Sequence, residues 1–186
     1  MGLVILLQMW KGIPVSDLTR DITSIAKVPP YIGFFSQIGI VFWMSTATLC
    51  LFSASTASNI SKKIKNSLYF SGMFTLLLGF DDMFQFHEQI VPYLFEVSEK
   101  VVFAIYAILV VSFLLKFYPT LLNTDYILLL LAFFFLGLSV FMDVIPIRGL
   151  NPALYENGAK MIGIVSWFFY FHSIAASTVS GQKEFD

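Results

Sequence analysis

Long apolar segments separated by short polar loops set the pattern of this 186-residue chain. A helix needs about 20 mostly apolar residues to cross the ~30 Å hydrocarbon layer of a bilayer. Five segments approach that length, although the second has only fifteen uncharged residues between Lys65 and Asp81. The pattern predicts an all-α fold, a polytopic transmembrane helix bundle of about five spans. The expected spans cover residues 31–54, 67–81, 100–116, 126–143 and 156–179.

The first thirty residues follow a different pattern. The run GLVILLQMW is about half as long as a span, so it forms either an interfacial or partial helix or the remainder of a sixth span. The next stretch, PVSDLTRDITSIAK, predicts one short amphipathic helix that starts at an N-cap Ser16 and stops before Pro29. We therefore expect an N-terminal interfacial segment over 1–30, the bundle over 31–180 and a cytoplasmic tail over 181–186.

Lysines in the short loops indicate an orientation. Lys62, Lys63 and Lys65 follow the first span and Lys116 follows the third, whereas the opposite loops are acidic. Because basic loops stay in the cytoplasm, the C-terminus is expected inside, in a bacterial plasma or thylakoid-type membrane. Three N-terminal cations act against this orientation, namely Lys11, Arg20 and Lys27.

Composition supports the membrane assignment and excludes some partners. The chain is 58% hydrophobic and 12% charged, where a soluble domain averages about 25% charged. The net charge of -1 argues against nucleic acid as a partner. The expected partners are the lipid bilayer and other membrane subunits or a homo-oligomer. The single cysteine, Cys50, excludes an internal disulfide.

Candidate chemistry gathers in and around FDDMFQFHEQ, residues 80–89. The second span is short, which places Asp81 and Asp82 within or at the edge of the membrane, where an ionised group needs a partner. Asp81 and Glu88 are seven residues apart and are expected to share a helix face, and Glu156 is four residues from Lys160. Helix ends on the same side of the membrane supply further acids. The candidate metal ligands are Asp81, Asp82, His87, Glu88, Glu99, Asp143 and Glu156, with Lys160 as an ion-pair partner.

These residues permit three arrangements. Carboxylates and a histidine on facing helices can hold a transition metal such as Fe, Mn or Zn, but the Glu-x-x-His signature of di-metal bundles is absent from the sequence. A network of ion pairs and a proton or cation path are the alternatives. His172 lies about 24 Å from Glu156 along the same span, too deep to join the cluster, and is expected to hydrogen-bond a neighbouring helix.

The segments IPVSDLTRDI, YIGFFSQIGIVFW, FDDMFQFHE and YENGAKMIGIVSWFFYF resemble those of small, uncharacterised multi-span membrane proteins of bacterial or cyanobacterial type. The resemblance covers most of the chain and implies no function. Three functions therefore remain open. The first is a metal-dependent enzyme acting on a lipid-soluble substrate, the second a non-enzymatic subunit of a membrane complex, and the third an ion- or proton-coupled carrier.

Overall fold

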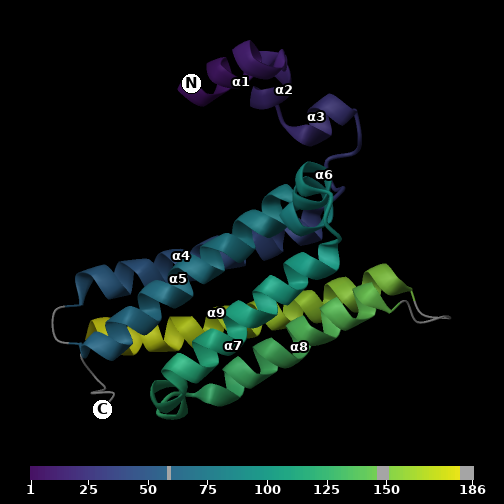
Figure 1. The fold of residues 1–186 in the computed structure, drawn as a ribbon. Coiled ribbons are helices and arrows are strands. Elements are labelled where there is room, and N and C mark those ends of the chain that lie inside the picture. The colour runs from purple at the N-terminus through teal and green to yellow at the C-terminus, as the bar shows by residue number, and fades with distance from the viewer. Residues whose placement is uncertain (58–59, 146–150, 181–186) are drawn as a thin grey trace. The chain divides into compact units, whose positions relative to one another are not determined.

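A computed structural model describes residues 1–57, 60–145 and 151–180, and every regular element in these ranges is a helix (Figure 1). The predicted all-α class is confirmed. The elements are α1 Gly2–Lys11, α2 Val15–Thr19, α3 Ile22–Ala26, α4 Phe34–Thr56, α5 Lys62–Phe84, a π-helix η1 Phe86–Ile90, α6 Val91–Phe95, α7 Glu99–Leu122, α8 Tyr126–Val144 and α9 Pro152–Ser180.

The chain divides into two compact units, and the first, Met1–Phe35, contains α1 to α3. Two short helices, α2 and α3, replace the single amphipathic helix predicted there, because Arg20 and Asp21 adopt extended conformations. Ser16 is not the N-cap, which is Pro14; the Ser16 hydroxyl donates to Asp17 instead. None of the residues of these three helices is buried.

The second unit begins at Ser36 and contains the long helices. Among the described residues, four helices are long and apolar enough to cross a membrane: Phe34–Thr56, Glu99–Leu122, Tyr126–Val144 and Leu154–Ser180. Helix α5 has 23 residues but carries lysines in its first turn and two aspartates near its end, which lowers its hydropathy. Its crossing of the membrane remains a prediction.

Local sequence determines both ends of α5. The Ser61 hydroxyl accepts a hydrogen bond from the Ile64 amide at 3.3 Å and caps the first turn. At the other end Gln85 adopts a left-handed conformation, with φ of 54°, and its amide donates to the Asp81 carbonyl. Such a residue ends a helix and turns the chain, so the next residues do not continue along the α5 axis.

The aromatic core of this unit is centred on Trp167 of α9. Its ring lies 6.2 Å from Trp43 of α4, 6.3 Å from Phe74 of α5 and 5.5 Å from Phe133 of α8. The indole N–H donates to the buried Thr75 hydroxyl at 3.0 Å. One residue therefore contacts three other long helices and fixes their depth relative to α9.

Helices α8 and α9 approach each other closely at Gly163. A Cβ atom there would lie 2.7 Å from Leu136 Cγ and 2.9 Å from the Leu136 backbone nitrogen. Since a backbone atom cannot rotate away, only glycine permits this approach, which is the small-residue packing typical of membrane helices.

Candidate functional site

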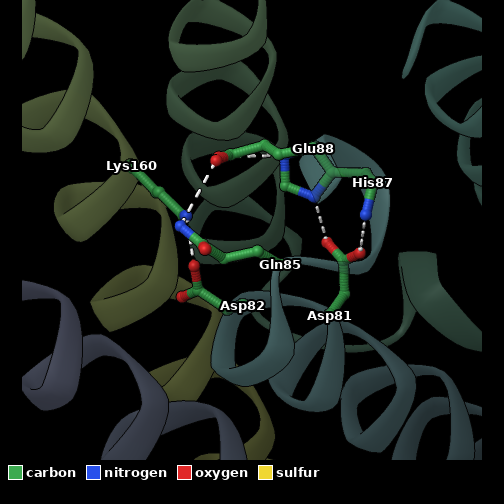
Figure 2. Close-up of polar contacts among 6 residues, drawn as sticks. All are labelled: Asp81, Asp82, Gln85, His87, Glu88 and Lys160. Carbon is green, nitrogen blue, oxygen red and sulfur yellow. Dashed lines mark hydrogen bonds and ion pairs between the residues drawn. The ribbon is translucent and has the colours of Figure 1, made fainter. Parts of the chain in front are cut away.

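The turn at Gln85 directs the chain back over the end of α5. As a result, the His87 backbone amide donates to Asp81 Oδ1 at 2.9 Å, and His87 Nδ1 lies 2.6 Å from Asp81 Oδ2 (Figure 2). The expectation that Asp81 and Glu88 share a helix face is therefore wrong. It assumed that α5 continues past Phe84, where the helix in fact ends.

Three further groups surround this Asp81–His87 pair. The Glu88 carboxylate lies 3.4 Å from His87 Nε2, and the Phe103 ring of α7 lies 5.0 Å from the imidazole. The Tyr106 phenol, also of α7, interacts with the Asp81 carboxylate. Side-chain exposure falls from 47% at Glu88 to 12% at His87 and 7% at Asp81, so the polar groups lead from the surface into the bundle.

A second polar pair joins α5 to α9. Lys160 donates to Asp82 Oδ1, and the Asp82 side chain is only 9% exposed (Figure 2). Asp82 is thus the ion-pair partner of Lys160, in place of the expected Glu156. The other carboxylate oxygen, Oδ2, is buried and has no hydrogen-bond partner within the described ranges.

The remaining predicted residues lie at different distances from these pairs. Glu156 is within electrostatic range of Asp143, Lys160 and Glu88, so four charged side chains gather near the start of α9. Asp143 is exposed at the end of α8. Glu99 occupies the first turn of α7 and, in the described part of the chain, makes no hydrogen bond or ion pair with the other candidates.

This arrangement differs from the metal site that the sequence suggested. Among the described residues, no three or more His, Cys, Asp or Glu side chains are grouped so that they could hold a metal ion. Figure 2 shows the reason, because the neighbouring carboxylates of Asp81 and Asp82 point to different partners, His87 and Lys160. The structure therefore does not support the metal-binding interpretation.

The groups around His87 shift the pKa of its imidazole. Burial is the largest influence and disfavours the charged imidazolium, and the Lys160 charge acts in the same direction. The hydrogen bond that His87 donates to Asp81 and the charges of Asp81 and Glu88 outweigh both, so the pKa of His87 lies above its ordinary value.

The sequence did not identify two residues of this site, Tyr106 and Gln85. Tyr106 lies seven residues after Glu99, two helical turns along the face that α7 turns to α5, but nothing in the sequence identified Asp81 as its partner. Gln85 was missed because a left-handed conformation is unusual outside glycine and asparagine. His172 is exposed, and its ring contacts Phe168; the expected hydrogen bond to a neighbouring helix is not found in the described part of the chain.

The described residues include four helices that are long and apolar enough to cross a bilayer, which is typical of a multi-pass membrane protein. The chain belongs to the family described as domain of unknown function (DUF8692), whose model matches residues 1–174. No curated protein and no solved structure matches the chain at a significant level.

Proposed function

We propose that this chain is a proton-coupled membrane carrier in which His87 takes up and releases the coupling proton. The observation that supports the proposal is the position of His87 between a buried carboxylate, Asp81, and a half-exposed one, Glu88. A histidine is the side chain best suited to exchange protons near neutral pH, and carboxylates on both sides stabilise its charged form.

The two ring nitrogens of His87 have different roles in this proposal. Nδ1 donates to Asp81, which also accepts the His87 backbone amide and so fixes both the ring orientation and the tautomer. Nε2 lies toward Glu88 at 3.4 Å and is the nitrogen that exchanges its proton with the surface. Asp81 and Tyr106, which belong to the long helices α5 and α7, form the inner end of the path along which the proton moves.

The Lys160–Asp82 pair holds α9 against α5 beside this path. The Lys160 charge also lowers the proton affinity of His87, so any movement of α9 away from α5 changes that affinity. The position of α9 and the protonation of His87 therefore depend on each other. A proton-coupled carrier requires at least one such dependence between conformation and protonation.

NMR titration of the imidazole tests the proposal directly, since the chain has only two histidines. In ring-labelled protein carrying His172→Gln, the remaining signal should titrate with a pKa above the ordinary ~6.5. Asp81→Asn should lower that pKa. A His87 signal that does not titrate, or that is unaffected by Asp81→Asn, contradicts the proposal.

Proton flux provides the functional measurement. Liposomes that contain the protein and an internal pH dye, driven by a potassium diffusion potential, should take up protons faster than protein-free liposomes. His87→Gln should reduce the excess rate by about tenfold or more, whereas His172→Gln should leave it unchanged. Equal rates of proton uptake in liposomes with and without the protein would show that the protein alone moves no protons.

A second candidate function, a non-enzymatic subunit of a membrane complex, is favoured by the ion pair between α5 and α9, which is suited to locking helices together. In that case His87→Gln lowers the thermal stability of the protein and leaves proton flux at the level of protein-free liposomes. The two measurements together separate the candidates.

A further inference from the structure

Helix α5 is interrupted at Gln85 although the sequence there is compatible with a continuous helix. Between Gly79 and Pro92 the chain contains neither glycine nor proline, the two residue types that most often end a helix. The residues after the bend are helical as well, because η1 and α6 follow one another without a break from Phe86 to Phe95. The interruption consists of Gln85, with φ of 54° and ψ of 45°.

Tertiary contacts of His87, and not the local sequence, hold this bend in place. A residue with a Cβ atom is sterically disfavoured in the left-handed region, whereas glutamine is among the better helix formers. Two hydrogen bonds compensate for this, because the His87 backbone amide and ring both donate to Asp81, at 2.9 Å and 2.6 Å. The Phe103 ring of α7 packs on the imidazole at a centroid distance of 5.0 Å.

Rotation of Gln85 into the ordinary helical region would join α5 directly to η1. None of the residues of η1 is buried, so the segment can move without opening the core. The longer helix would end or bend at Pro92, which lacks the N–H that continues the ladder. On one continuous helix His87 would lie about 120° around the axis from Asp81, too far to reach its carboxylate.

We propose that Gln85 is a conformational switch that converts α5 between this bent form, in which His87 contacts Asp81, and a straight form that continues to Ile90. The inference deepens the proposed function, on which its role in proton transfer rests. In the bent form the proton on His87 is held against Asp81, and in the straight form His87 is separated from that carboxylate. The change in helix shape itself can be measured without any proton transport.

The distance between two spin labels measures the shape of the helix. Met73 of α5 and Gln89 of η1 are both exposed and can be replaced by labelled cysteines, while native Cys50 is buried. From position 73 to position 89 a straight helix spans about 24 Å, and the bent form gives a shorter distance. In nanodiscs, the doubly labelled protein should show the shorter distance as its main population and the longer one as a minor population.

Glycine and alanine at position 85 should shift this equilibrium in opposite directions. Gln85→Gly favours the bent form, because glycine adopts the left-handed conformation without steric cost, and Gln85→Ala favours the straight helix. The ratio of the long to the short distance should differ by about ten- to thirtyfold between the two variants. Asp81→Ala removes the acceptor of both hydrogen bonds and should also increase the long-distance population.

Position 83 provides the matched control. Met83 is exposed and would be helical in both forms, so Met83→Gly and Met83→Ala should leave the ratio unchanged. A short distance alone in both Gln85→Ala and Asp81→Ala, or equal shifts at positions 83 and 85, would overturn the switch.

Proton flux into liposomes separates the switch from the proposed function. A distance ratio that follows the residue at position 85, with flux at the protein-free level, supports the switch and rejects the carrier. Flux that depends on His87, with the same distances in Gln85→Gly and Gln85→Ala, supports the carrier and rejects the switch.

Discussion

Two consecutive carboxylates, Asp81 and Asp82, have different partners because they leave α5 in different directions. Asp81 accepts two hydrogen bonds from His87, whereas Asp82 pairs with Lys160 and keeps one oxygen unpaired. Successive residues on an α-helix are about 100° apart, so the two carboxylates point in different directions. Exchanging or neutralising one aspartate should therefore affect one pair and spare the other.

The raised pKa of His87 makes the stability of the protein depend on pH. The groups that face its ring are Asp81, Glu88, Lys160 and Phe103, and the carboxylates dominate. The folded state binds the His87 proton more tightly than the unfolded chain. Its stabilising contribution is thus complete below the unfolded pKa of about 6.5 and is lost as pH rises through the higher folded pKa. The thermal midpoint in detergent should fall over that interval.

Variants of the same pair are the controls for this pH dependence. In Asp81→Asn and in His87→Gln the fall of the midpoint above about pH 6.5 should shrink or vanish, because no tightly bound proton remains to be lost. His172→Gln should retain the fall. A wild-type midpoint that rises across the same interval would contradict the assignment of His87.

Removing one member of the Lys160–Asp82 pair should lower the free energy of unfolding. Lys160→Met leaves the Asp82 carboxylate buried with neither oxygen paired, and we expect it to lower the free energy of unfolding by about 3–5 kcal/mol. Adding Asp82→Leu removes the unpaired charge and should recover much of the loss. The exposed Lys100 provides the matched control, since Lys100→Met should change stability by less than about 0.5 kcal/mol. Chemical denaturation in mixed micelles measures all three.

At the scale of the helices, α5 and α9 meet in a regular antiparallel seam. Asp82 contacts Lys160, and seven residues further along each helix Thr75 contacts Trp167. A further step along both helices leads to a small cavity of about 20 Å³, whose polar lining residues are Ser67, Thr120, Thr124 and Tyr170. The seven-residue interval is two helical turns, so the polar contacts recur on one face of each helix and fix the register of the pair.

Helix packing predicts opposite effects for two glycine substitutions. Gly163→Ala pushes a methyl group against the Leu136 backbone and should destabilise the fold by about 1–3 kcal/mol. Gly137→Ala on α8 meets nothing within 4 Å and should be neutral or stabilise by up to about 1 kcal/mol, because alanine is the better helix former. Thermal unfolding of the two variants in the same detergent compares them. Equal losses would mean that the α8–α9 contact is not close-packed.

The sequence predicted the long helices better than the site. Span positions follow from hydropathy, which depends on composition and not on tertiary contacts, so the five segments coincide with α4, α5, α7, α8 and α9. The pairing of His87 with Asp81 was not predictable, because helical periodicity assumes an unbroken helix and fails beyond the left-handed Gln85. The exposure of His172 was not predictable either, because it depends on which helices pack against α9.

For the whole molecule, the loop lysines predict that the ends of α5 lie on opposite sides of the membrane. Ser61 and Glu88 flank this helix, and both are exposed. In intact cells a membrane-impermeant thiol reagent should label Glu88→Cys, and Ser61→Cys only after the membrane is opened. Native Cys50 is buried and gives the background. Labelling of both positions from outside would show that α5 does not cross.

The contact between Trp43 and Trp167 also has an optical consequence. Two buried indoles with centroids 6.2 Å apart and planes inclined at 67° are close enough for their excited states to couple. The circular dichroism of the native protein should therefore contain a paired positive and negative band from these two rings. The third tryptophan, Trp10, is exposed in the other unit and does not contribute to that pair of bands. Loss of the two bands then reports the separation of α4 from α9. This measurement requires no known substrate.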